Sequence, residues 1–351
     1  MNIYHIETMA FEGFPKHSKT ISFPSGIEYS TVFIPKPANS THASILFLHG
    51  FPSSSYDWHN QISYFSRKGY GVIAPDLLGY GRSSSPNSLE PYAFKNICED
   101  LIQILGQCNV KLDEGEKVHV VSHDFGSILA GSLLGYFPHI ALTASFLAVP
   151  YMPPGQKQDL DMIKKISEDI LGYEFLGYQR FFMRDDSWKV IGEHKESFFA
   201  LVYGPDEYLT TDFFPAGKLE EWLKADRKLP LQGWVTTEYK ETRDRIFSRE
   251  DAYKGPTDWY RARFRDFLGI EEEAKDCESS ITCPVLSLHS KEPNALIDGA
   301  LKGMKMLIKD LRYKELSVKG HFVQLEAPDE VNMSLEEFFT ECSGNASELS
   351  R

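Results

Sequence analysis

The chain has 351 residues, of which 42% are hydrophobic and 13% are aromatic, and its formal net charge at pH 7 is −13. A chain of this length can bury a large core and can hold one main domain with an insertion. The acidic balance argues against electrostatic binding to nucleic acid or to an anionic membrane, because both carry negative charge. Composition therefore indicates a globular protein, and the motifs along the chain must indicate its function.

The cysteines and the targeting signals point to the cytoplasm. The five cysteines are an odd number and lack the spacing of metal ligands, which favours reduced thiols. No segment reaches the ~18 apolar residues of a membrane span, and the first residues lack the apolar run of a secretory signal. We therefore expect a cytoplasmic protein that binds neither a metal nor a membrane.

Two strand signals lie in the N-terminal third. Ser44–Leu48 is an apolar run that leads into a turn at 49–52, and Gly71–Pro75 is a second one that leads into a glycine-rich loop at 76–83. Strands that alternate with helical segments in this rhythm predict a parallel sheet. The first turn could be an ordinary Gly/Pro turn. Its place after a buried strand instead favours a loop whose backbone N–H, that of Phe51, faces a reacting oxygen.

The segment 121–126, Val-Ser-His-Asp-Phe-Gly, has the form of a nucleophile elbow with aspartate where serine is usual. It follows an apolar strand at 117–121 and precedes an apolar helix. Ser122 and Gly126 are small at the crowded positions, and Asp124 stands at the helix N-terminus, where the dipole favours a charged carboxylate. Asp124 could simply cap the helix. As a nucleophile it would displace a leaving group at a saturated carbon and form an ester that water can hydrolyse.

An ester on Asp124 points to the opening of an epoxide or the loss of a halide. The N–H of Phe125 would pair with that of Phe51 as donors to the oxyanion that forms when water attacks the ester. We expect the rings of Phe51, Phe125 and Trp58 to line an apolar substrate pocket.

The middle of the chain interrupts the strand pattern with helical and aromatic-rich sequence. We expect a first core part at 1–149, an inserted helical cap at 150–269 and a second core part at 270–351. Tyr178 and Tyr260 lie in the insertion. On general grounds each would be a packed aromatic with its hydroxyl at the surface.

The C-terminal part carries the remaining candidates. An apolar strand at 284–289 is followed by a loop with Glu292 and, further on, Asp298. Such charges are usually solvated. The stretch 320–328 follows another short strand and precedes an amphipathic helix. Of the eleven histidines, His321 in this stretch has the context that suits a general base.

Taken in chain order, the turn at 49–52, the glycine loop at 76–83, the aspartate elbow and the Gly-His segment resemble the α/β-hydrolase superfamily. Within it, they resemble the soluble epoxide hydrolases, from about residue 19 to about residue 339. The resemblance implies an α/β-hydrolase fold, with a mostly parallel twisted sheet, helices on both faces and an inserted, mainly helical cap. It also implies the order nucleophile, acid, histidine along the chain.

The resemblance also implies roles for residues outside the elbow. The segments around Tyr178 and Tyr260 are similar to those that carry the two oxirane-binding tyrosines of the family. Two phenol donors suit the chemistry, since an alkoxide leaves poorly until it is protonated. The family most often has aspartate where an ungapped match places Pro293. Glu292, one residue earlier, is therefore the first candidate for the acid that orients the histidine, and Asp298 is the second.

Together these features predict an epoxide hydrolase. Asp124 would attack the epoxide, Tyr178 and Tyr260 would bind its oxygen, and His321, oriented by Glu292, would activate the water that releases a vicinal diol. The mechanism needs no cofactor and no metal. The expected partners are a small apolar epoxide and water, in a monomer or homodimer that binds no nucleic acid and no membrane.

Two alternatives remain. A haloalkane or haloacid dehalogenase shares the aspartate, acid and histidine but needs N–H donors for the departing halide, and the side chains of Phe51 and Phe125 offer none. A hydrolase-like protein that binds a ligand without turnover is the second alternative, and the intact set of candidate residues argues against it.

Overall fold

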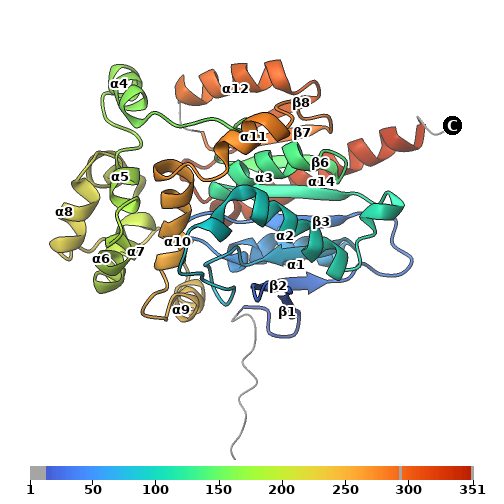
Figure 1. Ribbon diagram of the computed structural model, residues 1–351, viewed down its shortest axis with the longest axis horizontal. Helices are drawn as coiled ribbons and strands as arrows, with labels where there is room; N and C mark the ends of the chain where they lie inside the picture. Colours follow the sequence, from blue (N-terminus) through green and yellow to red (C-terminus); the bar gives the residue numbers. More distant parts are fainter. Residues whose placement is uncertain (1–12, 292–294, 349–351) are drawn as a thin grey trace, which may run out of the picture.

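The computed structural model describes residues 13–291 and 295–348 (Figure 1). Its centre is one eight-stranded sheet in the order β1-β2-β4-β3-β5-β6-β7-β8. The strands β1 and β2 are antiparallel, as are β2 and β4, whereas every other neighbouring pair from β4 to β8 is parallel. This confirms the predicted, mostly parallel sheet. The strands are β1 (Ser18–Ser22), β2 (Glu28–Ile34), β3 (Ser44–Leu48), β4 (Gly71–Pro75), β5 (Val118–His123), β6 (Ala141–Leu147), β7 (Val285–His289) and β8 (Leu311–Glu315).

Helices cover both faces of this sheet. The α-helices are α1 (His59–Arg67), α2 (Phe94–Gln107), α3 (Phe125–Tyr136), α4 (Leu160–Leu171), α5 (Tyr178–Phe182), α6 (Ser187–Glu193), α7 (Lys195–Val202), α8 (Lys218–Lys224), α9 (Thr237–Ile246), α10 (Lys254–Tyr260), α11 (Ile270–Asp276), α12 (Ala295–Leu307), α13 (Val323–Glu326) and α14 (Pro328–Glu348). The short 3-10 and π segments are η1 (Ser55–Trp58), η2 (Glu90–Tyr92), η3 (Leu112–Glu114), η4 (Asp206–Tyr208), η5 (Leu209–Phe213) and η6 (Arg261–Arg265).

The hydrophobic core forms two clusters. One contains side chains of α2 and α3, such as Leu101 and Leu129, and the other contains side chains of α1 and α14, such as Phe65 and Leu335. Every residue of β3, β4, β5 and β7 is buried. Parallel strands with helices on both faces need such continuous apolar runs, because neither face meets water. The apolar runs that predicted strands at 44–48 and 71–75 therefore reflect this two-sided cover.

Between β6 and β7 the described chain consists of helices and loops and adds no strand to the sheet. We call residues 150–269 of this segment the helical insertion. In Figure 1, α5, α6, α7 and α8 gather to one side of the sheet, while α10 lies between them and the core. Among the described helices, none combines the length and the apolar character that a membrane crossing requires.

Candidate active site

Asp124 occupies a strained turn between β5 and α3. Its backbone angles are φ 53° and ψ −123°, a region that residues other than glycine seldom adopt. The turn also needs glycine two residues later, because a Cβ atom on Gly126 would collide with the carbonyl oxygens of Leu48 and His49. The strand, the sharp turn and the helix thus have the geometry that the sequence pattern predicts.

The two carboxylate oxygens of Asp124 have different partners. The Phe51 N–H donates a hydrogen bond of 2.8 Å to Oδ1, and Nε2 of His321 lies 3.3 Å from Oδ2. Burial acts to raise the pKa of Asp124, but the interactions with His321 and the Phe51 N–H outweigh it and lower the pKa to about 2. The carboxylate is therefore charged, with one oxygen held by the backbone and the other beside the imidazole.

The loop that carries Phe51 packs directly on the elbow. A Cβ atom on Gly50 would collide with the Asp124 carboxylate and with the backbone nitrogen of Phe125. His49 anchors this loop, because its Nε2 accepts a hydrogen bond of 2.9 Å from the Leu77 N–H. Burial lowers the pKa of His49 to about 4, so the ring is neutral and can accept. The loop after β3 is thus fixed from both sides.

Tyr260 lies at the end of α10 against the loop and the elbow. Its ring centroid is 5.3 Å from that of Phe51 and 5.0 Å from that of Phe125. The neighbouring Trp259 donates a hydrogen bond of 2.8 Å from Nε1 to the carbonyl oxygen of Leu78, which fastens α10 to the glycine-rich loop after β4. Tyr260 is therefore placed by the packing of its ring and by the bond of its neighbour Trp259.

Tyr178 begins α5, and its ring packs on Phe213 with centroids 4.7 Å apart. Burial raises the pKa of Tyr178, and the charge of Asp124 raises it further. The pKa of Tyr260 also lies well above its usual value, because of burial first and then because of Tyr178 and Asp124. Both phenols are thus protonated donors that lie within the electrostatic influence of one carboxylate. The structure brings these two tyrosines, Asp124 and His321 together.

His321 lies between β8 and α13, and its side chain is 36% exposed. Its backbone carbonyl oxygen lies 2.9 Å from Nε2 of His123. Burial, together with the nearby His321, lowers the pKa of His123 to about 3, so this neutral ring donates one hydrogen bond to the carbonyl. The residue before Asp124 therefore also holds the backbone of His321.

Comparisons with known proteins agree with this geometry. A family model described as alpha/beta hydrolase fold matches residues 43–167. An epoxide hydrolase of Neurospora crassa is 29% identical over 316 residues, which cover 87% of this chain and 89% of that protein. The solved structure of an epoxide hydrolase from an endophytic Streptomyces covers 94% of this chain and 97% of its own, at 25% identity and a TM-score of 0.75. The chain has the α/β-hydrolase fold, and it is similar to epoxide hydrolases in both sequence and structure.

The resemblance inferred from the sequence motifs is thereby confirmed, as are the fold and the expectation of a hydrolase. The bifunctional epoxide hydrolase 2 of Rattus norvegicus is 25% identical over 293 residues. The match covers 83% of this hydrolase but 50% of the rat protein, so the chain spans about half the length of that relative.

The structure places Trp58 differently from the sequence expectation. Its side chain is fully buried and packs on Phe47, with ring centroids 5.1 Å apart, in the cluster that contains α1 and α14. Phe51 and Phe125 belong to the other cluster. Trp58 therefore fills the core of the hydrolase beneath the turn, and we correct its assignment to the substrate pocket.

Of the two acid candidates, the structure describes only Asp298. Glu292 lies outside the described residues. Asp298 is exposed in the first turn of α12. In the part of the chain that the structure describes, no cluster of three or more His, Cys, Asp or Glu side chains could hold a metal ion.

Glu326 is a residue of this site that the sequence motifs did not single out. Its carboxylate accepts hydrogen bonds from the N–H groups of Gly320 (3.1 Å) and Phe322 (2.9 Å), which flank His321. A Cβ atom on Gly320 would collide with this carboxylate. Burial, together with the charge of Asp206, raises the pKa of Glu326 to about 7. The sequence does contain a signal for Glu326. The residue follows His321 closely and lies in a short helix, where an acidic side chain can reach back to free N–H groups.

Proposed function

We propose that this hydrolase opens small apolar epoxides to vicinal diols through a covalent ester on Asp124. The observation that carries the proposal is the asymmetry of the Asp124 carboxylate. One oxygen accepts the Phe51 N–H at 2.8 Å, and the other lies 3.3 Å from Nε2 of His321. A nucleophile, a base and an oxyanion donor then surround one carbon atom, as ester formation and hydrolysis require.

In the first step, Oδ2 of Asp124 attacks a carbon of the oxirane, and the bond from that carbon to the ring oxygen breaks. The oxygen leaves as an alkoxide and takes a proton from Tyr178 or Tyr260. Both phenols are protonated because burial raises their pKa values, and an alkoxide is basic enough to accept a proton from either. The helical insertion, residues 150–269, acts in this proposal as the cap that carries both donors.

In the second step, neutral His321 takes a proton from a water molecule, which attacks the carboxyl carbon of Asp124. Oδ1 becomes an oxyanion that is held by the N–H groups of Phe51 and Phe125. Collapse of this intermediate breaks the bond to the diol oxygen, which takes the proton back from His321. The second proton of the water leaves the new carboxyl group and, by way of solvent, restores the phenol that was deprotonated in the first step. Asp124 is then again a carboxylate, with one oxygen atom from water.

We retain Glu292 as the acid that orients His321. The backbone supports this placement, because β7 and β8 are parallel neighbours with His289 opposite Glu315. The N–H of Lys291 donates a hydrogen bond of 2.7 Å to the carbonyl oxygen of Val318. The chain just before Glu292 thus lies beside the segment that leads to His321.

The experiment that tests the function is a single turnover with enzyme in excess over an epoxide such as styrene oxide. Acid quenching followed by mass spectrometry of the peptide that contains Asp124 should detect the added mass of the epoxide before diol accumulates. Diol formation without any such adduct at early times would contradict the ester mechanism. Faster release of halide from haloalkanes than opening of any epoxide would contradict the substrate class.

A further inference from the structure

Tyr203 follows α7 in the helical insertion and touches two loops of the core. Its side chain is fully buried. Its hydroxyl donates a hydrogen bond of 3.2 Å to the carbonyl oxygen of Pro52, the residue after Phe51. Its ring stacks on Phe322, the residue after His321, with centroids 4.8 Å apart and an angle of 20°. One side chain of the insertion therefore contacts both loops that act in ester hydrolysis.

Arg243 on α9 holds the hydroxyl of Tyr203 from the other side. Its Nε donates a hydrogen bond of 3.2 Å to the Tyr203 oxygen. The guanidinium carbon also lies 5.0 Å from the ring centroid of Tyr203, 4.9 Å from that of Phe199 and 4.4 Å from that of Phe247. Because the Tyr203 oxygen accepts from Arg243, its proton points to Pro52. Arg243 thus fixes the direction of the hydrogen bond to the loop at 49–52, which we call the oxyanion loop.

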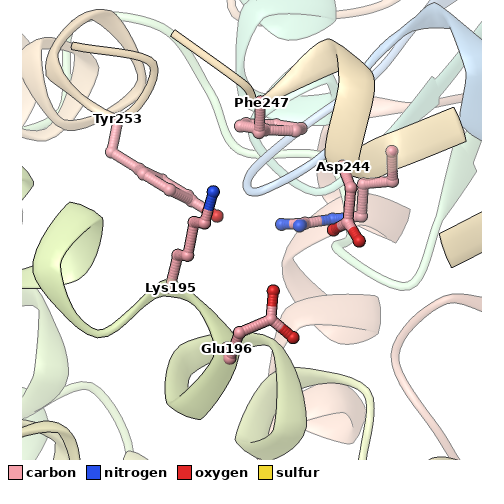
Figure 2. A pocket seen from close by; sticks show the side chains of 6 residues that line it. Lys195, Glu196, Asp244, Phe247 and Tyr253 are labelled. Atoms are coloured by element: carbon pink, nitrogen blue, oxygen red, sulfur yellow. The ribbon is translucent and has the colours of Figure 1, made fainter. Parts of the chain in front are cut away.

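The outer side of Arg243 meets a small surface pocket. Figure 2 shows this pocket, which is lined by Lys195, Glu196, Arg243, Asp244, Phe247 and Tyr253. None of the candidate catalytic residues lines it. Arg243 itself is 3% exposed, and its Nη2 is buried with no hydrogen-bond partner among the described residues. The Arg243 guanidinium therefore makes its contacts within the protein interior and not with solvent.

A buried acid complements this buried charge. Asp57 in η1 is 2% exposed, and its Oδ1 accepts a hydrogen bond of 2.9 Å from the hydroxyl of Tyr239 on α9. Burial raises the pKa of Asp57 to about 6, while its hydrogen bonds and the charge of Arg243 act to lower the pKa. Tyr239 therefore fastens α9 to η1 directly, and Arg243 connects α9 to Pro52 by way of Tyr203.

We propose that Tyr203, oriented by Arg243, is a positioning residue for ester hydrolysis. It holds the oxyanion loop through Pro52 and the loop between β8 and α13, which carries His321, through Phe322. The Phe51 N–H and His321 therefore keep their places on opposite sides of the ester carbon. This inference rests on the proposed ester mechanism. The oxyanion donor and the base act together only in the second step. Loss of the Tyr203 hydroxyl therefore affects ester hydrolysis more than ester formation.

The Tyr203→Phe variant tests this directly, because it keeps the ring on Phe322 and removes the bond to Pro52. Single turnovers with styrene oxide give the rate constants for ester formation and ester hydrolysis separately. Hydrolysis should slow by on the order of tenfold, since small misplacements of reacting groups have effects of this size or larger. Formation should change by less than about twofold, so the ester accumulates and KM falls together with kcat. Tyr253→Phe is the matched control, because Tyr253 is a buried tyrosine of the insertion whose ring packs on Phe198 and Phe247 rather than on either loop.

Arg243→Met should slow hydrolysis in the same direction. The double variant with Tyr203→Phe should lose little more than the more impaired single variant, because both changes remove the same bond. Equal slowing of both steps in Tyr203→Phe, or no slowing of either, would overturn the positioning role while leaving the ester mechanism intact. Diol formation by the wild-type enzyme without any ester would instead refute the mechanism, and this inference with it.

Discussion

In the sheet core, the groups proposed to form and hydrolyse the ester are held by backbone geometry, whereas in the helical insertion they are held by side-chain packing. Asp124 is lifted out by its φ of 53°, and the Phe51 N–H faces it because the loop after β3 packs on the elbow. Tyr260, by contrast, is placed by rings around it and by the bond from Trp259 to Leu78. In the proposed mechanism the insertion activates the epoxide and the core hydrolyses the ester, with Tyr203 as a link between them.

The largest effect is expected from the core. Asp124→Ala removes the nucleophile and should lower diol formation by more than about a hundredfold, because losses of nucleophiles are usually far larger than that. The fold should survive, since the side chain lies at the site and not in either hydrophobic cluster. Diol assays together with thermal unfolding measure both. A folded variant that kept more activity would show that Asp124 is not the nucleophile.

Changes to the tyrosines of the insertion should impair the earlier step, ester formation. The double variant Tyr178→Phe and Tyr260→Phe keeps the rings and removes both proton donors. Each lost hydrogen bond to developing charge should cost on the order of 2–4 kcal/mol of transition-state stabilisation. The variant should therefore bind epoxide but form no ester on the timescale of wild-type turnover, as mass spectrometry would detect. Ester formation at the normal rate would show that the two tyrosines do not take part in opening the epoxide.

His321→Gln should show the opposite failure, with ester formation retained and hydrolysis slowed by about 10²–10⁴-fold, the usual contribution of a general base. The protein should then keep the mass of the substrate after one turnover. Ester formation should persist in weakly acidic solution, because the pKa of Asp124 is about 2 and the carboxylate stays charged. Loss of ester formation in weakly acidic solution would contradict the role of Asp124 as the charged nucleophile.

The smallest effect should come from Glu326→Gln. A carboxamide has one acceptor oxygen, and its NH₂ group faces a second N–H donor, so it can hold only one of the two N–H groups beside His321. Hydrolysis should slow by several-fold, about the effect of one weakened hydrogen bond, and ester formation should be unchanged. Glu337→Gln is a suitable control, since Glu337 is exposed on α14. Equal behaviour of the two variants would remove Glu326 from the site.

The sequence predicts the core of the site better than its surroundings, and for a physical reason. The elbow and the loop after β3 depend on short stretches in which small residues and buried strands leave few backbone conformations. The bond from Tyr203 to Pro52 joins residues 151 positions apart, and no local pattern encodes it. The sequence also gives the wrong position for Trp58, because an aromatic residue after a turn does not by itself indicate which face of the sheet it packs on.

The central claim is that water attacks the carboxyl carbon of Asp124 and not the epoxide itself. A single turnover in water enriched in ¹⁸O tests this most directly. If water attacks the ester, the peptide containing Asp124 should gain one heavy oxygen, while the diol formed in that turnover should contain none. Heavy oxygen in the diol, with an unlabelled Asp124, would mean that water opens the epoxide directly, and the covalent account would be wrong.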